Sequence, residues 1–170
     1  SGSTLRFLIP LFSLTGQKIT FTGDGRLLQR PQDVYRQIFK NQGLLFDHTD
    51  DRIVVEGALK AGEYTLPGNV SSQFVSGLMF TLPLLEGDSK IHIVPPFESR
   101  GYALMTAHML SRFGVEIRWE DDFTLCIKGG QKYTAHNETV EGDYSQLAFF
   151  AVLGAINGTV EIEGADPDSM

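Results

Sequence analysis

Residues 72–80 read Ser72-Gln73-Phe74-Val75-Ser76-Gly77-Leu78-Met79-Phe80, and apolar side chains would stand on almost every side of a helix built from them. A strand can also hold an apolar run, but a span of about 12 residues with Gly, Ser and Gln interspersed favours a helix. A helix that is apolar all round is buried rather than amphipathic. We therefore expect a buried helix over residues 73–85, and this helix decides the fold.

Outward from this helix, the chain shows one pattern twice. A strand over 64–66 precedes it, and a strand (90–94), a helix (102–113) and two strands (115–119 and 123–127) follow. The first part of the chain has the same order, with helices over 4–14 and 32–40 and strands over 18–22, 44–47 and 52–55. Lys18-Ile19-Thr20-Phe21 matches Lys90-Ile91-His92-Ile93. A third copy begins with a helix over 145–156 and the strand-like run 158–164.

The repeat predicts an α/β fold (α+β in some schemes) made of βαβαββ units, with copies at about 3–57, 64–129 and, incompletely, 145–164. Alternating strands and helices predict mixed or parallel sheets. The first helix of each copy is apolar nearly all round, so these helices would share one interior with the sheets outside. Because the chain opens directly on a helix and closes within a third copy, we expect a truncated single domain of a longer protein.

Composition narrows the class of protein. The chain has 170 residues, which suits one domain with a real core, and its net charge of −7 argues against nucleic acid or an anionic membrane as a partner. It has neither a long apolar run nor a visible signal peptide, and its single cysteine fits a reducing cytoplasm. We expect Cys126 to be a small buried residue of a strand. The four histidines show no metal-ligand spacing.

The starts of the predicted helices carry the candidate chemistry. One opens with Ser1-Gly2-Ser3-Thr4, one with Gly68-Asn69-Val70-Ser71-Ser72-Gln73, and one follows Glu98-Ser99-Arg100-Gly101-Tyr102. Helix starts present backbone N–H groups and partial positive charge, and serine and glycine let an anion approach. A lone serine there is more often a simple cap. Two adjacent serines followed by glutamine exceed what a cap needs, so we expect phosphate groups at these starts.

The loop over residues 22–31 brings Arg26 and Arg30 beside two glycines, between a strand and a helix. Ligands commonly bind at such loops in α/β proteins, and arginine can donate two hydrogen bonds at once to a phosphate or carboxylate. A solvated loop remains the alternative. Glu120-Asp121-Asp122 is expected to be a hairpin turn only.

Four blocks together resemble the 3-phosphoshikimate 1-carboxyvinyltransferase family, the 5-enolpyruvylshikimate-3-phosphate synthases. They are Ser1-Gly2-Ser3-Thr4-Leu5-Arg6, the loop from Gly23-Asp24 to Arg30-Pro31, Gly68 to Phe74, and Val140-Glu141-Gly142-Asp143-Tyr144-Ser145. They stand in family order and span nearly the whole chain, and the Ser-Ser-Gln and Arg-Pro blocks are the specific ones. The resemblance implies two domains of three βαβαββ units each, with helix starts facing the cleft between them. This chain would be most of the N-terminal-type domain.

The resemblance also implies the substrates and their residues. Shikimate 3-phosphate would be bound by Ser71, Ser72, Gln73, Ser99 and Tyr102. Phosphoenolpyruvate would be bound by Gly2, Arg30 and Gln73, with Ser3 and Arg6 beside it. Arg30 is the expected contact for its phosphate, or for the inhibitor glyphosate that competes for this place in the family.

The implied reaction is an addition–elimination that transfers the enolpyruvyl group to shikimate 3-phosphate and releases phosphate, a step of aromatic amino acid biosynthesis. It implies neither a metal nor an organic cofactor. The acid–base residues would lie in the second domain, so this chain would hold no catalytic residue and be inactive alone. We expect a monomer at full length, and self-association of the piece through exposed apolar helix surface.

Two other functions remain open. One is the related UDP-N-acetylglucosamine enolpyruvyl transferase, which has the same fold. The Ser71-Ser72-Gln73 block and the strand location of Cys126 argue against it. The other is a repeat-built domain that binds or assembles without catalysis.

Overall fold

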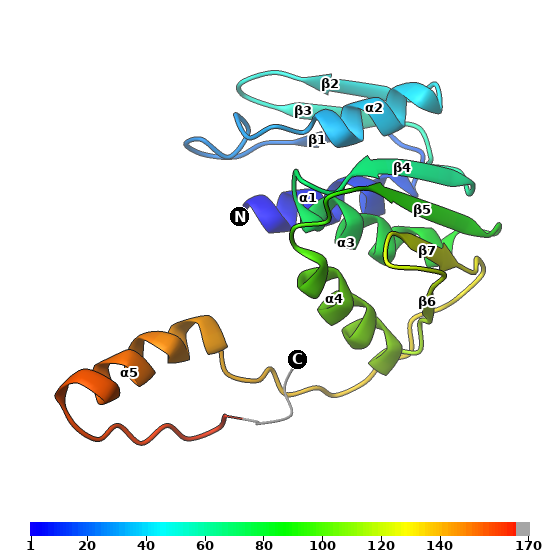
Figure 1. Cartoon of the computed structure of the whole chain (residues 1–170). Helices are drawn as coiled ribbons and strands as arrows, with labels where there is room; N and C mark the ends of the chain where they lie inside the picture. Colours follow the sequence, from blue (N-terminus) through cyan, green and yellow to red (C-terminus); the bar gives the residue numbers. More distant parts are fainter. Residues whose placement is uncertain (166–170) are drawn as a thin grey trace. The chain divides into compact units, whose positions relative to one another are not determined.

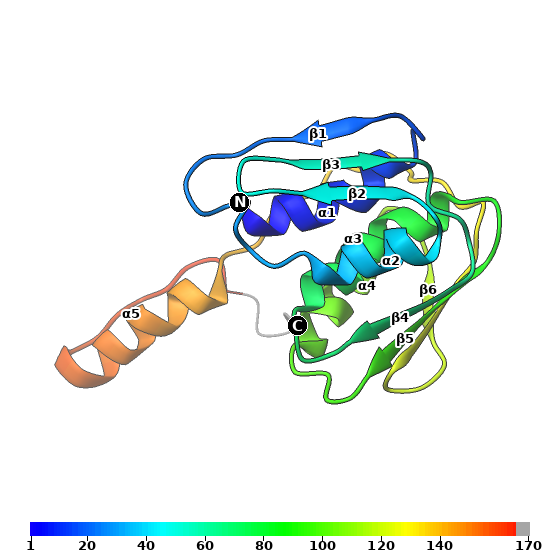
Figure 2. The ribbon, with the colours of Figure 1, turned by 90° about the horizontal axis from the view of Figure 1, so that it is seen from above.

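The computed structural model describes residues 1–165 and contains two compact units, one over Ser1–Thr134 and one that begins at Ala135. Helix α1 (Gly2–Ser13), strand β1 (Ile19–Phe21), helix α2 (Asp33–Asn41) and strands β2 (Leu45–His48) and β3 (Ile53–Glu56) make the first half of the first unit. β3 pairs antiparallel with both β1 and β2, so the sheet order is β1-β3-β2 (Figure 2).

The second half of this unit contains strand β4 (Glu63–Pro67), helix α3 (Ser72–Thr81), the 3-10 turn η1 (Leu82–Leu84) and strand β5 (Ser89–Val94). Helix α4 (Arg100–Arg112) and strands β6 (Ile117–Trp119) and β7 (Thr124–Ile127) complete it. The sheet order is β4-β5-β7-β6, and β4 and β5 run parallel while the other pairs are antiparallel. The strands β5-β7-β6 therefore reproduce β1-β3-β2 in order and direction. The predicted repeat and α/β class are confirmed, with a mixed sheet in the second copy and an antiparallel one in the first.

Helices α1 and α3 lie side by side, and the sheets lie outside them (Figure 1). Gly77 allows this approach, because an added Cβ would lie 2.2 Å from the Tyr35 hydroxyl oxygen and 2.6 Å from the Arg6 carbonyl oxygen. α3 is buried along most of its length, as its sequence predicts. It ends earlier than expected, because Pro83 has no N–H to continue the helical ladder and its ring clashes with the preceding turn.

The burial prediction is less accurate for the other first helices. α1 buries one face, with Leu5 and Ile9 inside and Phe12 43% exposed, because α3 and the first sheet cover only part of its surface. In the second unit, helix α5 (Tyr144–Asn157) has no buried residue. No strand forms within 158–164, so the prediction of a strand there is wrong. The described part of this unit offers no second strand for pairing, and a lone strand is not stable.

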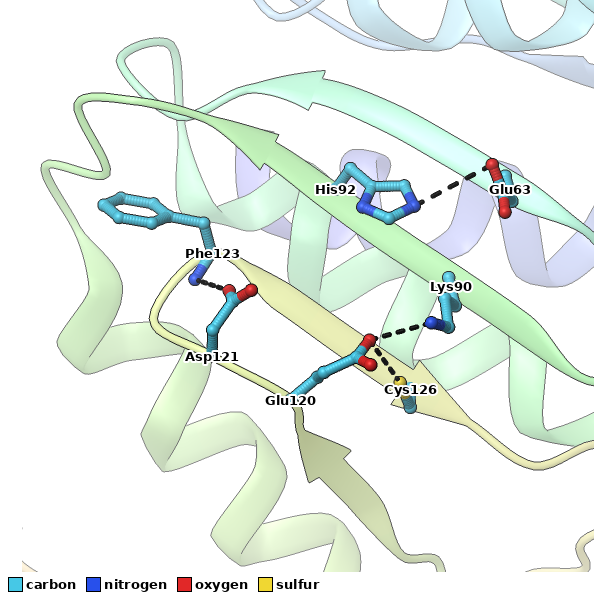
Figure 3. Close-up of polar contacts among 7 residues, drawn as sticks. All are labelled: Glu63, Lys90, His92, Glu120, Asp121, Phe123 and Cys126. Carbon is cyan, nitrogen blue, oxygen red and sulfur yellow. Dashed lines mark hydrogen bonds and ion pairs between the residues drawn. The ribbon is translucent and has the colours of Figure 1, made fainter.

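Cys126 also differs from its prediction. It is half-buried, and its thiol donates a hydrogen bond to Glu120 Oε2 at 3.4 Å (Figure 3). Strand alternation explains this difference, because Leu125 and Ile127 face the core and Cys126 therefore faces the opposite side of the sheet.

Across residues 1–165, the structure contains no helix that has both the length and the apolar character needed to cross a membrane.

Candidate phosphate-binding site

Two loops leave the second sheet at the carboxyl ends of its parallel strands. β4 leads through residues 68–71 into α3, and β5 leads through residues 95–99 into α4. Gly68 joins the two loops: its N–H donates to the Val94 carbonyl at 2.9 Å, and its carbonyl accepts from Glu98 N at 3.3 Å. A Cβ at Gly68 would lie only 2.6 Å from the Pro96 carbonyl oxygen, so the contact requires glycine. The carboxyl ends of parallel strands are the usual ligand edge of α/β proteins.

The three serines expected to hold a phosphate stand on these loops and the helix starts. Ser71 is the N-cap of α3, and its hydroxyl accepts from Gln73 N at 3.3 Å. Ser72 follows it and is buried. Ser99 is the N-cap of α4, where its side chain forms no capping hydrogen bond with the helix. Both starts therefore combine a hydroxyl with the positive end of a helix, a combination that suits an anion.

Gln73 links the starts of α1 and α3. Its side-chain amide donates to Ser3 Oγ at 2.8 Å and accepts from Arg6 Nη1 at 2.9 Å. The same Arg6 nitrogen lies 3.4 Å from Ser71 Oγ. Four residues separated by up to 70 positions along the chain thus form one hydrogen-bonded network.

Arg6 is held in place from several directions. Nη2 donates to the Pro31 carbonyl at 3.3 Å, and the guanidinium lies 4.5 Å from the centre of the Phe74 ring. Burial lowers the pKa of Arg6 from its usual value, and the nearby positive charge of Arg30 lowers it further. An anion between these two guanidinium groups would relieve this repulsion.

Arg30 stands against the beginning of α1. A Cβ on Gly2 would lie 2.6 Å from Arg30 Nη1, so the absence of a side chain at Gly2 lets the guanidinium approach the helix start. Gly2 and Arg30, both expected to contact phosphoenolpyruvate, therefore lie next to each other. Tyr102, in the first turn of α4, has a side chain that is 66% exposed.

Tyr35 is a contributor that the sequence did not reveal. Its hydroxyl donates to the Arg6 carbonyl at 2.6 Å, and its ring packs edge-on against Phe74 at 4.9 Å between centres. Burial raises the pKa of Tyr35 well above its usual value, so the phenol stays protonated and acts as a fixed donor. The helical periodicity of α2 marks Tyr35 as a core residue, but nothing in the sequence shows that its hydroxyl reaches α1.

The arrangement can bind and orient anions. Three helix starts, two arginines and several hydroxyl groups supply donors and positive charge. The raised pKa of Tyr35 makes its phenol unsuited to accept a proton near neutral pH. The donors and the positive charge of this arrangement suit the binding of anions.

Comparison with known proteins identifies the family of this chain. The family model described as EPSP synthase (3-phosphoshikimate 1-carboxyvinyltransferase) matches residues 1–170. Relatives named 3-phosphoshikimate 1-carboxyvinyltransferase from Clostridium kluyveri and Clostridium novyi are 46% and 47% identical over 172 residues; these alignments cover 100% of this chain and 40% of each relative. An EPSP synthase structure from Acinetobacter baumannii is 28% identical with a TM-score of 0.75, covering 92% of this chain and 35% of that one. This chain, which spans 40% of the length of its clostridial relatives, belongs to the EPSP synthase (3-phosphoshikimate 1-carboxyvinyltransferase) family.

Proposed function

We propose that this chain supplies substrate-binding residues to an enzyme that transfers the enolpyruvyl group of phosphoenolpyruvate to shikimate 3-phosphate. The observation that carries this proposal is the Gln73 bridge, which holds the starts of α1 and α3 together. Two anionic substrates must meet for the reaction, and this bridge lies between two places suited to anions.

The sugar phosphate is assigned to the starts of α3 and α4. Ser71, Ser72 and Ser99 offer hydroxyl groups there, and the contact at Gly68 keeps the two loops together. Tyr102 would cover the shikimate ring, for which its exposed side chain is available. Gln73 would lie at the boundary between this substrate and the next.

Phosphoenolpyruvate is assigned to the start of α1. Arg30 lies against Gly2, and Ser3 and Arg6, both hydrogen-bonded to the Gln73 amide, complete the set of polar groups. A bidentate guanidinium suits the phosphate or the carboxylate of this substrate. Glyphosate, an anionic competitor in the family, would take the same place at Arg30.

In the proposed reaction, the hydroxyl of shikimate 3-phosphate gives up its proton as its oxygen attacks the enol carbon of phosphoenolpyruvate, and the methylene carbon takes a proton to become a methyl group. Loss of a proton from this methyl group and cleavage of the carbon–oxygen bond to phosphate then restore the double bond and release phosphate. The chain's own residues would hold the two reactants within reach of each other, which removes much of the entropic barrier. We assign the proton-transferring groups to a second domain. Residues 1–170 would form one N-terminal-type domain that is built from the three repeat copies. The reaction needs no metal or organic cofactor.

The phosphorylated substrates are small molecules, and we place the enzyme in the cytoplasm as a monomer at full length. The UDP-N-acetylglucosamine enolpyruvyl transferase alternative is not favoured, because the family model and both clostridial relatives carry the shikimate name. A purely binding domain without catalysis is not favoured for the same reason.

Calorimetric titration of the chain with shikimate 3-phosphate tests the proposed site. We expect Ser72→Ala to weaken binding about tenfold, because it removes one hydrogen bond to a charged phosphate. Ser71→Ala should weaken it similarly and also lower stability by about 1 kcal/mol, since Ser71 caps α3. The matched control is Ser76→Ala in the same helix, where the hydroxyl bonds Thr106 at 2.8 Å instead.

Equal affinity of wild type, Ser71→Ala and Ser72→Ala would contradict the phosphate assignment. Turnover of both substrates by residues 1–170 alone would contradict the assignment of proton transfer to another domain.

A further inference from the structure

The hairpin between β6 and β7 carries contacts that neither the turn prediction nor the proposed site explains. Asp122, in its turn, pairs with Arg100 Nη2 at 3.0 Å. The Arg100 guanidinium also lies 5.1 Å from the centre of the Trp119 ring, at the end of β6. Arg100 is the first residue of α4, so its side chain reaches from the proposed phosphate site to a separate part of the sheet.

The loop before α4 also contacts the same indole through Phe97. The Phe97 ring lies 6.4 Å from the Trp119 ring, tilted by 31°. Ser99 lies between Phe97 and Arg100 in the sequence. The loop therefore contacts Trp119 through one residue before this serine and one residue after it. Ile93 N donates to the Phe123 carbonyl at 2.8 Å, which places the hairpin turn beside the end of β5 where the loop begins.

Two polar atoms show how closely Arg100 packs against Trp119. Arg100 Nε and Trp119 Nε1 are shielded from solvent and have no hydrogen-bond partner among the described residues. The contact between guanidinium and indole therefore leaves the hydrogen-bonding capacity of both N–H groups unused. Arginine suits this place because a planar, weakly hydrated guanidinium can stack on an aromatic ring and pair with a carboxylate at once.

We propose that Trp119 and Asp122 are positioning residues that act through Arg100 to fix Ser99, and with it the start of α4, for the sugar phosphate. This inference rests on the proposed function. A free loop would have to be ordered when the phosphate binds, and the entropy of ordering would lower the affinity. The hairpin contact fixes the loop before the ligand arrives.

The test compares Asp122→Asn with a matched control on the same hairpin. Glu120 is two residues away and forms an ion pair with Lys90 at 2.8 Å, on the sheet face shown in Figure 3. Glu120→Gln therefore removes an exposed ion pair of the same kind without touching α4. The probe is shikimate 3-phosphate, titrated into the chain by calorimetry, with inorganic phosphate as a second probe.

We expect Asp122→Asn to raise the dissociation constant of shikimate 3-phosphate about fivefold, the upper end for an exposed ion pair. Asp122→Glu should recover most of the affinity, and Glu120→Gln should leave it unchanged. Melting temperatures should stay within about 2 °C of wild type, so the loss is in binding and not in folding.

Trp119 is the single tryptophan of the chain, so its fluorescence reports on this contact directly. Saturation with shikimate 3-phosphate should change the emission of the wild type. The emission of Arg100→Met should differ before ligand is added and respond less to it.

If the wild type binds shikimate 3-phosphate, three results would overturn the inference. Asp122→Asn could keep the wild-type affinity, Glu120→Gln could lose as much affinity as Asp122→Asn, or Asp122→Asn could bind more tightly than the wild type. Tighter binding would mean that Arg100 leaves Asp122 and binds the phosphate itself. Failure of the wild type to bind shikimate 3-phosphate would instead contradict the proposed function, and this inference would fall with it.

Discussion

At the scale of single residues, Gly2 sets the position of Arg30. A methyl group at Gly2 would lie 2.6 Å from Arg30 Nη1, which is the far end of a flexible side chain. Gly2→Ala should therefore leave the melting temperature nearly unchanged but displace the guanidinium and weaken phosphoenolpyruvate binding about tenfold. Titration of phosphoenolpyruvate in the presence of shikimate 3-phosphate measures this effect. Thr4→Ala, on the exposed side of the same turn, is the control, and equal affinities of Gly2→Ala and wild type would refute the role of Gly2.

Gln32 lowers the stability of the first unit. It is 1% exposed, and neither polar atom of its side-chain amide has a partner among the described residues. An unpaired buried amide costs about 1–3 kcal/mol, so Gln32→Met, with similar shape and no polar group, should raise the free energy of unfolding by that order. Urea denaturation measures the change, and Gln17→Met on the surface should have no effect. An unchanged or lower stability of Gln32→Met would show that the amide is satisfied in solution.

At the scale of elements, the helix starts differ in what their side chains do. Ser71 caps α3, whereas Ser99 at α4 and Ser1 at α1 form no side-chain cap. α5 is capped by Asp143, whose carboxylate accepts from Ser145 N at 2.9 Å. α1, α2 and α4 begin without a side-chain cap, and at α1 and α4 the proposed ligands would supply the missing acceptor.

The Asp143 cap predicts a pH dependence of α5. Hydrogen bonds from the side chain and the backbone of Ser145 lower the pKa of Asp143. A lowered pKa contributes stability that is present above the unfolded value of about 4 and is lost as the pH falls through the folded value. The helical carbon chemical shifts of residues 144–147 should therefore decrease between about pH 5 and pH 2.5. Asp143→Asn, which can still cap, should show no such change, and an equal response in both chains would contradict the cap.

At the scale of the whole molecule, α5 exposes large apolar side chains that its own unit does not cover. Phe149 and Ile156 are 72% and 79% exposed, on a helix that is apolar on all sides. Such surface drives association, so sedimentation velocity should show oligomers that grow with protein concentration. Phe149→Ser combined with Ile156→Ser should shift the chain towards monomer. Purely monomeric wild type at all concentrations would refute this expectation.

The sequence by itself determined the repeat, the class of fold and the residue types at the helix starts. Each of these depends on local order: the apolar run of α3, the matching strands at Lys18 and Lys90, and serines before helices. It did not determine burial of α1 and α5, because burial depends on what covers a helix and not on its own composition. The strand prediction over 158–164 failed for a related reason, since a strand exists only with a partner.

Only the tertiary structure decided how the candidate site is assembled. The Gln73 bridge to Ser3 spans 70 positions, Tyr35 reaches Arg6 from another helix, and Asp122 reaches Arg100 from a turn that looked purely structural. Local patterns carry no information on such contacts, because they arise where distant elements pack. The resemblance to a family suggested the candidate site residues, and the packing of α1 against α3 brings Ser3, Arg6 and Gln73 within hydrogen-bonding distance.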